Sequence, residues 1–265
     1  MVGARLSQGL DWTEGRRAVR DRRFLVSTEA ILGEGPIRLS EKEARHLAVV
    51  LRLGVKDTVE LIDGKGHLLK GEIQEINAKK NLVLVKPVAP PIFQDDRLPI
   101  ILFAGLLRSE KMDLVVQKAS EMGIEKIIPV ITQRSVARPG KEKTKRWEAV
   151  ALQALKQCKG LMAPDISPPT AFEAIPEVVK DLKVSFATVL APEPGLPSLL
   201  HCLIKKSTPY AIFVGPEGGF TEHELRFLTD VGFTPSSLAP RVLRAETACI
   251  ASIGIAVNIA AMAKA

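Results

Sequence analysis

The chain has 265 residues and a formal net charge of +7, with 46% hydrophobic, 25% charged and 5% aromatic residues. This is the composition of a globular protein with one large domain or two, and its basic charge favours a polyanionic partner such as nucleic acid. The few aromatic residues argue against a surface of base-stacking rings, and three isolated cysteines without a CxxC pair argue against a zinc site or a disulfide framework, as expected in a reducing cytoplasm.

The first quarter of the chain predicts an extension followed by a small β domain. Residues 1–21 show no sustained periodicity and no apolar signal-peptide segment, so we predict an N-terminal extension. Residues 22–88 predict a mostly β domain with one helix, which starts at the capping-box pattern Ser40-Glu-Lys-Glu43. Asp63-Gly-Lys-Gly66 joins two apolar runs and therefore indicates a hairpin rather than a nucleotide loop. The predicted elements are strands at 23–27, 58–62, 68–76 and 82–88 and a helix at 40–51.

The middle of the chain changes from short strands to alternating strands and longer helices. Residues 89–99, which contain three prolines, are predicted to be a linker. Beyond them, apolar runs alternate with helical patterns, which predicts a mainly parallel α/β sheet. Ser109 is expected to cap the first of these helices and Gly123 to end it. The predicted elements are strands at 100–107, 126–131 and 184–190 and a second long helix at 144–158.

A run of basic residues lies at the start of the 144–158 helix. We interpret it as a solvated face, and phosphate contact remains the alternative. The run consists of Lys141, Lys143, Lys145 and Arg146.

The last stretch, 209–265, predicts two loops that could share one ligand. The apolar strand Tyr210–Val214 breaks at GPEGGF (Gly215–Phe220), and Thr221-Glu-His-Glu224 follows as a capping box. Strand, glycine turn and capped helix are typical of a ligand-cradling corner of an α/β sheet, although a simple tight turn has the same pattern. A second short strand at 233–238 and a final helix to about residue 263 complete the chain. That helix is short for a membrane span, and its apolar circumference predicts burial on all sides, partly against another subunit.

Two motifs in succession carry a family resemblance. GPEGGFTEHEL (Gly215–Leu225) followed by LAPRVLRAETA (Leu238–Ala248) resembles the signature of the RsmE family. These are SPOUT-class enzymes that methylate N3 of a uridine in 16S ribosomal RNA. Further segments fall in the family's order, so that the resemblance extends from about residue 22 to the C-terminus. They lie at 23–26, 43–46, 50–53, 111–121 and 134–136.

The resemblance implies a two-domain α/β protein. Residues 22–88 would form a PUA-like RNA-binding β-barrel, and residues 100–265 a SPOUT methyltransferase domain with a trefoil knot. It further implies S-adenosyl-L-methionine (AdoMet) as the methyl donor, 16S ribosomal RNA in the small subunit as the partner, a homodimer, and a cytoplasmic role in ribosome biogenesis without metal or membrane.

Three loops are expected to converge around the adenosine of AdoMet, with small side chains that leave a narrow slot. The expected cofactor-binding residues are Leu190, Ala191, Gly215, Pro216, Glu217, Gly218, Gly219, Leu238, Ala239, Pro240, Val242, Leu243 and Ala248. The residues expected to face RNA are Arg23, Arg45, His46, Arg52, Arg108, Lys111 and Lys159, with a merely solvated basic face as the alternative for each.

Uridine N3 must lose a proton as it accepts the methyl group. Arg241 and Arg244 are expected to hold an RNA phosphate or to stabilise the developing uridine anion. Glu246 could accept the proton, but at the start of the last helix it could equally complement the helix dipole.

One stretch departs from the family pattern. Where relatives carry an arginine after the 144–158 helix, this chain has Lys156-Gln-Cys-Lys-Gly-Leu-Met162, with Lys159 as the nearby substitute. Because arginine and lysine are not interchangeable at a bidentate site, the departure bears on the target nucleotide or on the efficiency of methylation. One alternative function is an RNA-binding ribosome-assembly factor with little or no methyltransferase activity, against which the intact loops argue. Another is a dinucleotide enzyme, for which the GxGxxG motif is missing.

Overall fold

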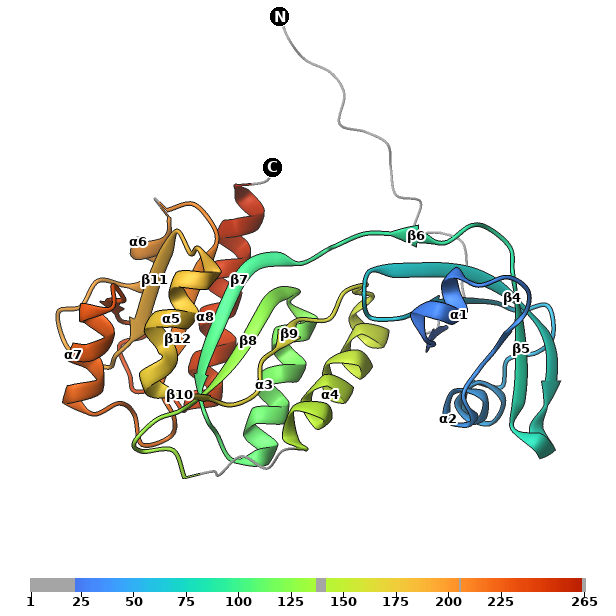
Figure 1. The fold of residues 1–265 in the computed structure, drawn as a ribbon, viewed down its shortest axis with the longest axis horizontal. Coiled ribbons are helices and arrows are strands. Elements are labelled where there is room, and N and C mark those ends of the chain that lie inside the picture. Colours follow the sequence, from blue (N-terminus) through green and yellow to red (C-terminus); the bar gives the residue numbers. More distant parts are fainter. Residues whose placement is uncertain (1–21, 137–141, 205, 264–265) are drawn as a thin grey trace, which may run out of the picture.

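A computed structural model describes residues 22–136, 142–204 and 206–263, which form two domains lying side by side (Figure 1). The expected extension at 1–21 and Lys141 of the basic run lie outside the described residues. The N-terminal domain is a six-stranded sheet in the order β1-β3-β4-β5-β2, with β6 paired to β4. Its strands are β1 (Arg23–Leu25), β2 (Ile37–Arg38), β3 (Thr58–Ile62), β4 (His67–Asn77), β5 (Leu82–Pro87) and β6 (Ile92–Phe93).

The helical part of this domain differs from the single helix predicted at 40–51. After α1 (Thr28–Leu32), α2 (Glu41–Arg45) runs directly into a π-helical turn, η1 (His46–Leu51), which ends at Arg52 in the left-handed conformation with φ 53°. Ser40 caps α2 as predicted, accepting a hydrogen bond from the Glu43 backbone. The Glu43 carboxylate does not complete the predicted capping box, because it points toward the C-terminal domain.

The predicted hairpin at 63–66 is confirmed. The buried Asp63 carboxylate accepts hydrogen bonds from the backbone N–H groups of Lys65 and His67, at 2.8 and 3.1 Å, and so fixes the turn between β3 and β4. A short 3₁₀ turn, η2 (Ala78–Lys80), joins β4 to β5. The hydrophobic core of the domain lies between its sheet and its helices and includes Phe24, Leu47, Leu61, Ile73 and Val85.

The residues predicted as a linker, 89–99, are more structured than expected. They contain β6, and the first strand of the second domain already begins at Leu98. Asp96 accepts hydrogen bonds from the backbone of Leu161 and Met162, at 2.8 and 3.1 Å, so the 89–99 segment is tied to the loop after α4 (Lys143–Cys158). These hydrogen bonds to a distant loop explain why the proline content of the 89–99 segment does not by itself predict its structure.

The C-terminal domain is a parallel sheet in the order β10-β8-β7-β12-β11-β13, with β9 paired to β8. This confirms the predicted parallel α/β sheet. Its strands are β7 (Leu98–Gly105), β8 (Ile124–Ile131), β9 (Asp165–Ile166), β10 (Thr170–Ala171), β11 (Phe186–Leu190), β12 (Tyr210–Val214) and β13 (Thr234–Ser236). Its helices are α3 (Ser109–Glu121), α4 (Lys143–Cys158), the 3₁₀ turn η3 (Phe172–Ala174), α5 (Ile175–Leu182), α6 (Leu199–Leu203), α7 (Glu222–Asp230) and α8 (Ala245–Met262).

Helices cover both faces of this sheet. One hydrophobic core joins α3, α4, α6 and α8 to the sheet, and a second core joins α5 and α7 to its other face. Ser109 is the first residue of α3 rather than its cap, because the N-cap position falls on Arg108. The trefoil knot stays a prediction.

Helix α8 is the one described helix long and apolar enough to cross a membrane by length and composition. It packs into the core through Cys249, Ile253, Ala256 and Ala260, which is the behaviour of a core helix in a globular domain. Complete burial raises the pKa of the Cys249 thiol to about 12, so this cysteine is inert rather than reactive.

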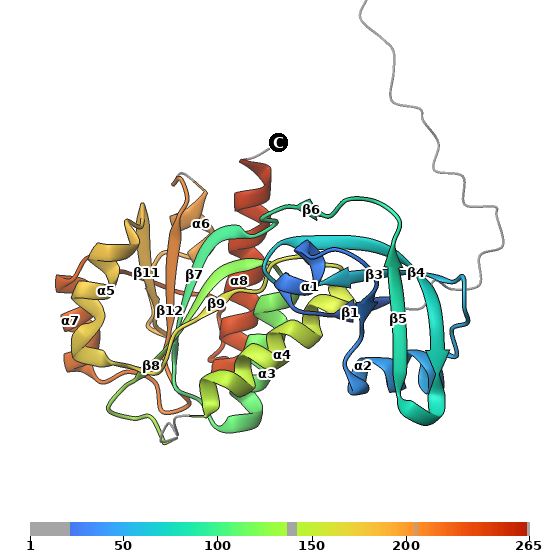
Figure 2. The same ribbon diagram turned by 45° about the vertical axis from the view of Figure 1, so that its right-hand side comes forward.

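Polar and apolar contacts fix the joint between the two domains. Lys156 Nζ in α4 donates to both carboxylate oxygens of Glu43 in α2, at 3.0 and 2.8 Å, and both side chains are largely buried. Ile62, Leu155 and Leu161 form a small hydrophobic cluster beside this pair. Figure 2 shows the consequence, with α4 lying against the N-terminal domain.

We therefore expect Lys156→Met to lower the free energy of unfolding by about 3 kcal/mol, because it leaves the Glu43 carboxylate buried without its counter-ion. Urea unfolding measures the change. The matched control is Arg226→Met, which removes the exposed ion pair with Glu222 on α7 and should have little effect. Equal changes in the two variants would contradict a specific contribution from the interdomain pair.

Candidate functional site

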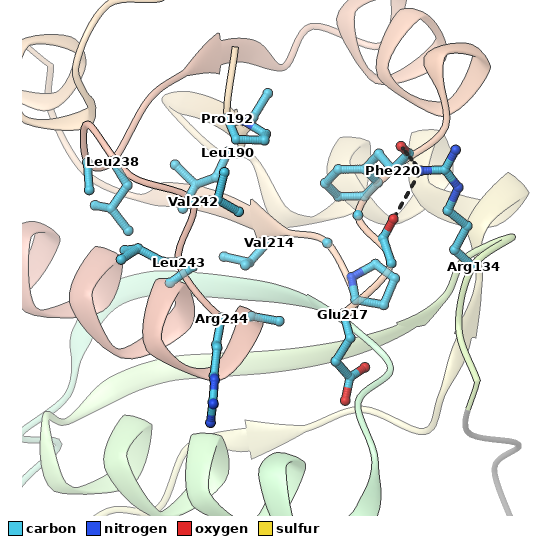
Figure 3. Close-up of a pocket in the computed structure, with 18 of the residues that line it drawn as sticks. Arg134, Leu190, Pro192, Val214, Glu217, Phe220, Leu238, Val242, Leu243 and Arg244 are labelled. Carbon is cyan, nitrogen blue, oxygen red and sulfur yellow. Dashed lines mark hydrogen bonds between the residues drawn. The ribbon is translucent and has the colours of Figure 1, made fainter. Parts of the chain in front are cut away.

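Three loops meet at one edge of the parallel sheet. They follow β11, β12 and β13, which are adjacent strands running in the same direction, so their carboxyl ends lie together. Between the loops lies a cavity of about 650 Å³, which also reaches Lys111 at the start of α3 (Figure 3). The predicted convergence of separate loops is thus present.

The loop after β12 passes unusually close to the end of β7. A Cβ atom at Gly105 would lie 2.4 Å from Pro216 N and 2.8 Å from Gly215 C, so only glycine fits beside this loop. The loop closes with a hydrogen bond from Gly219 N to Pro216 O at 2.9 Å, with Gly219 in the left-handed conformation at φ 67°. The tight turn considered from the sequence exists, and it forms part of the cavity wall.

Arg134, which follows β8, holds the same loop from outside. Its guanidinium donates to the carbonyl oxygens of Gly218 and Phe220, at 3.0 and 3.2 Å (Figure 3). The next anchor is Glu224, whose buried carboxylate completes the predicted capping box with Thr221 and also accepts from Gln133 N at 2.7 Å. The loop is therefore pinned to β8 at two points.

We expect Arg134→Ala to weaken AdoMet binding about tenfold, because two loop carbonyls lose charged donors that each contribute on the order of 1 kcal/mol. Isothermal titration calorimetry with AdoMet measures the affinity. Arg38→Ala, at an exposed position in β2 of the other domain, is the control. Unchanged affinity in Arg134→Ala would mean that the loop holds its shape without this clamp.

A cation between two carboxylates lies at one end of the cavity. Lys111 Nζ is 3.3 Å from Glu217 Oε1 and 3.3 Å from Glu246 Oε2, and Arg108 N donates to Glu217 Oε1 at 3.4 Å. Burial raises the pKa of Glu217, but hydrogen bonds from backbone N–H groups and the charge of Lys111 outweigh it, and the net pKa lies below its ordinary value. Glu246 Oε2 is buried and forms no hydrogen bond with a described residue. This end of the site is thus charged.

The rest of the cavity is apolar. Leu190, Val214, Leu238, Val242 and Leu243 gather on one side, while Glu217 and Arg244 point away from them (Figure 3). The cavity volume falls in the range of small-molecule sites, which combine apolar walls with a few placed polar groups. A small ligand with an apolar part and a charged end fits this arrangement. No cluster of metal-ligating side chains occurs in the described part of the chain.

Comparison with known proteins assigns the family. A family profile described as "RNA methyltransferase domain" matches residues 94–257, well over half of the chain. The chain belongs to the RNA methyltransferase family. A second profile, "RNA methyltransferase PUA domain", matches residues 39–86 and confirms the expected type of the N-terminal domain.

Individual proteins agree with this assignment. The Ribosomal RNA small subunit methyltransferase E of Bacillus subtilis is 28% identical over 238 residues, which span 86% of this chain and 92% of the relative. The enzyme of the same name from Neisseria gonorrhoeae, solved bound to S-adenosyl methionine, has a TM-score of 0.75 at 26% identity, over 88% of this chain and 95% of that one. A Legionella pneumophila protein solved in complex with SAM has a TM-score of 0.77 at 29% identity, over 90% and 97%.

In this RNA methyltransferase, all the residues expected to bind the cofactor line the cavity except Pro240, which is exposed. Arg241 and Arg244 also line it. Glu246 does not, because its carboxylate turns to Lys111. Pro192, Glu193, Val214 and Phe220 line the cavity from within the loops that the sequence predicted to converge, at 190–195 and 214–220. The sequence did not predict Arg134, Leu225 and Ala245, which lie outside these loops and carry no local signal for a ligand site.

Of the residues expected to face RNA, Arg23 needs correction. Its guanidinium is buried in the domain joint, donating to Glu60 Oε2 at 2.6 Å and to the Gly160 carbonyl at 3.0 Å, so it does not face solvent. Lys111 lines the cofactor cavity of the methyltransferase. The remaining four arginines and lysines are exposed and His46 is half-buried, and their contact with RNA stays a prediction: Arg45, His46, Arg52, Arg108 and Lys159.

Proposed function

We propose that this protein transfers the methyl group of AdoMet to N3 of a uridine in 16S ribosomal RNA of the small ribosomal subunit. The observation that carries the proposal is the cavity between the loops after β11, β12 and β13 in a chain of the RNA methyltransferase family. Relatives named Ribosomal RNA small subunit methyltransferase E, one of them solved with S-adenosyl methionine, support the substrate and the cofactor.

The cavity fits AdoMet through its own features. The loop of Gly215–Gly219 approaches the end of β7 so closely that a Cβ atom at Gly105 would block it. The apolar side chains that line the other part of the cavity would cover an adenine ring. When bound, AdoMet supplies a methyl group already activated by its sulfonium, so the protein contributes mainly positioning and electrostatics. Lys111 and Glu217 provide charged partners for the polar end of the cofactor.

Residues at the mouth of the cavity would bind the RNA and act on the target uridine. Arg241 and Arg244 are exposed there and carry no ion pair with a described residue, so they are free to hold a phosphate or to stabilise negative charge on the uridine. Glu246, next to Lys111, is a candidate to accept the N3 proton after that pair rearranges. Its present contact with Lys111 equally suits a role in holding the lysine.

A cytoplasmic homodimer is part of the proposal. Helix α8 leaves Ile250, Ile255 and Val257 only partly buried in the single chain, and Met262 is exposed. A second copy packed on α8 would cover these apolar side chains. Analytical ultracentrifugation tests this: a sedimentation mass twice that of the chain is expected, and a monomer at micromolar concentration would refute it.

The deciding experiment incubates the protein with labelled AdoMet and small subunits from cells that lack their own uridine methylase. We expect label at N3 of one uridine in 16S ribosomal RNA. Binding of AdoMet without any methyl transfer would refute this acceptor, and absence of AdoMet binding would favour an assembly factor that binds RNA only. Label on a different base would indicate that the departure from the family pattern at 156–162 changes the target nucleotide.

A further inference from the structure

A groove separate from the cofactor cavity runs along α4. It consists of two cavities, of about 580 and 370 Å³, which share Gln153 and Gln157 as lining residues. The larger one lies between α4 and the α2–η1 segment of the N-terminal domain, and the smaller one lies between α4 and α3. We call the two together the α4 groove.

The α4 groove follows one stripe of its helix. Arg146, Val150, Gln153 and Gln157 are spaced four, three and four residues apart, so they lie on one face of α4 in successive turns. The groove reaches α3 at Gln117, six residues after Lys111 of the cofactor cavity. Six residues of helix correspond to roughly 9 Å along the axis and about 1.7 turns, so Lys111 and Gln117 lie on different faces of α3 and the groove is less than two helical turns from the cavity.

The charges that line the α4 groove largely cancel. Glu43 is held by Lys156, and Arg146 by Asp113 of α3. Lys42 and Arg45 make no ion pair with a described residue, and the carboxylate of Glu41 lines the same cavity. A surface with such a weak excess of positive charge is poorly suited to bind a duplex through its phosphates alone.

The distinguishing feature of the α4 groove is the pair of carboxamide side chains that both of its cavities share. Gln153 and Gln157 are exposed and form no hydrogen bond within the described chain, whereas the Gln117 amide donates to Glu121. A free carboxamide presents one acceptor and two donors, the pattern that pairs with the edge of a nucleobase. The half-buried His46, whose ring packs edge-on against Phe24, and the exposed Val50 of η1 line the same cavity and supply an aromatic and an apolar side chain beside which an unpaired base could pack.

We propose that the α4 groove binds single-stranded ribosomal RNA next to the target uridine, with Gln153 and Gln157 hydrogen-bonding to its base edges. This inference rests on the proposed function for the identity of the RNA. Unpaired bases are required because base pairing occupies the Watson–Crick edges in an A-form duplex and its major groove is too narrow for side chains. Both domains would contact the strand, so their fixed arrangement would contribute to target choice.

The first test compares the affinity of the full chain for unmethylated small subunits with that of the double variant Gln153→Ala/Gln157→Ala, by filter binding. We expect about a tenfold weaker affinity in the variant, as for the loss of one good amide–base contact, with unchanged AdoMet affinity and thermal stability. Gln74→Ala, an exposed glutamine in β4 outside the groove, is the matched control and should bind like the wild type. Equal affinity of wild type and double variant would overturn the proposal.

The second test places photoreactive benzoylphenylalanine at position 153 of the full chain and maps crosslinks in bound small subunits. Crosslinks within about five nucleotides of the methylated uridine are expected from the spacing along α3. Crosslinks only to ribosomal protein, or only to distant RNA, would overturn the proposal. The binding test does not depend on catalysis. A wild type that binds the subunit through these glutamines but transfers no methyl group would refute the proposed reaction and leave the proposal for the groove intact.

Discussion

Gly105→Ala is expected to reduce AdoMet affinity on the order of 100-fold, the effect of displacing a positioning loop by about an ångström. The added Cβ would lie 2.4 Å from Pro216 N, 2.5 Å from Pro216 Cδ and 2.8 Å from Gly215 C. These are backbone and proline-ring atoms, which cannot rotate away as the end of a flexible side chain can. The loop after β12 must therefore move away from β7, and the wall of the cofactor cavity moves with it.

Isothermal titration calorimetry with AdoMet measures the loss, and thermal unfolding shows whether the variant still folds. Overpacking at this buried position should lower the free energy of unfolding by about 1–3 kcal/mol, which leaves a folded protein to titrate. The matched control is Gly54→Ala in the N-terminal domain, where the added Cβ would lie 3.9 Å from Asp57 Oδ2, an ordinary contact. Wild-type affinity in Gly105→Ala would show that the loop after β12 does not form the cofactor site.

Lys111→Met is expected to reduce methyl transfer on the order of 100-fold, as for the loss of one preorganised charged group from an active site. Methionine keeps the unbranched side chain and removes the charge. Glu217 and Glu246 would then face each other at the charged end of the cavity with no cation between them. Their mutual repulsion should displace both carboxylates or protonate one of them.

The pH dependence of stability distinguishes this electrostatic effect from a packing defect. In the wild type the pKa of Glu217 lies below its ordinary value of 4.5, with Lys111 among the causes. A lowered pKa in the folded state stabilises the protein above pH 4.5 and loses that contribution as the pH falls through the folded value. Without Lys111 the pKa of Glu217 rises, so the difference in Tm between wild type and variant should be large at pH 7 and shrink below pH 4.5.

Steady-state kinetics and thermal unfolding from pH 3 to 7 check both expectations. The control is Lys118→Met two turns along the same helix, where the lysine pairs with Glu121 on the surface, and it should keep full activity. A Tm difference independent of pH would assign the loss in Lys111→Met to packing.

Local sequence patterns anticipated much of the fold. Apolar runs predicted the longer strands, turn residues predicted the hairpin at 63–66, and the capping box at Thr221–Glu224 marked the start of α7. These features depend on residues close together in the chain, which a short window of sequence contains. The 89–99 segment was interpreted less well, because β6 and the bonds of Asp96 depend on partners in β4 and after α4.

The sequence by itself determined the parallel sheet, the glycine loop and most of the residues that line the candidate cofactor cavity, because the motifs that carry them are continuous in the chain. Only the tertiary structure decided that Arg23 is buried in the domain joint, that Arg134 clamps the loop, that Lys111 lies between two carboxylates and that α2 faces α4 across a groove. Each of these joins residues tens of positions apart. Such pairings are selected by the packing of whole elements against one another, which a local pattern does not encode.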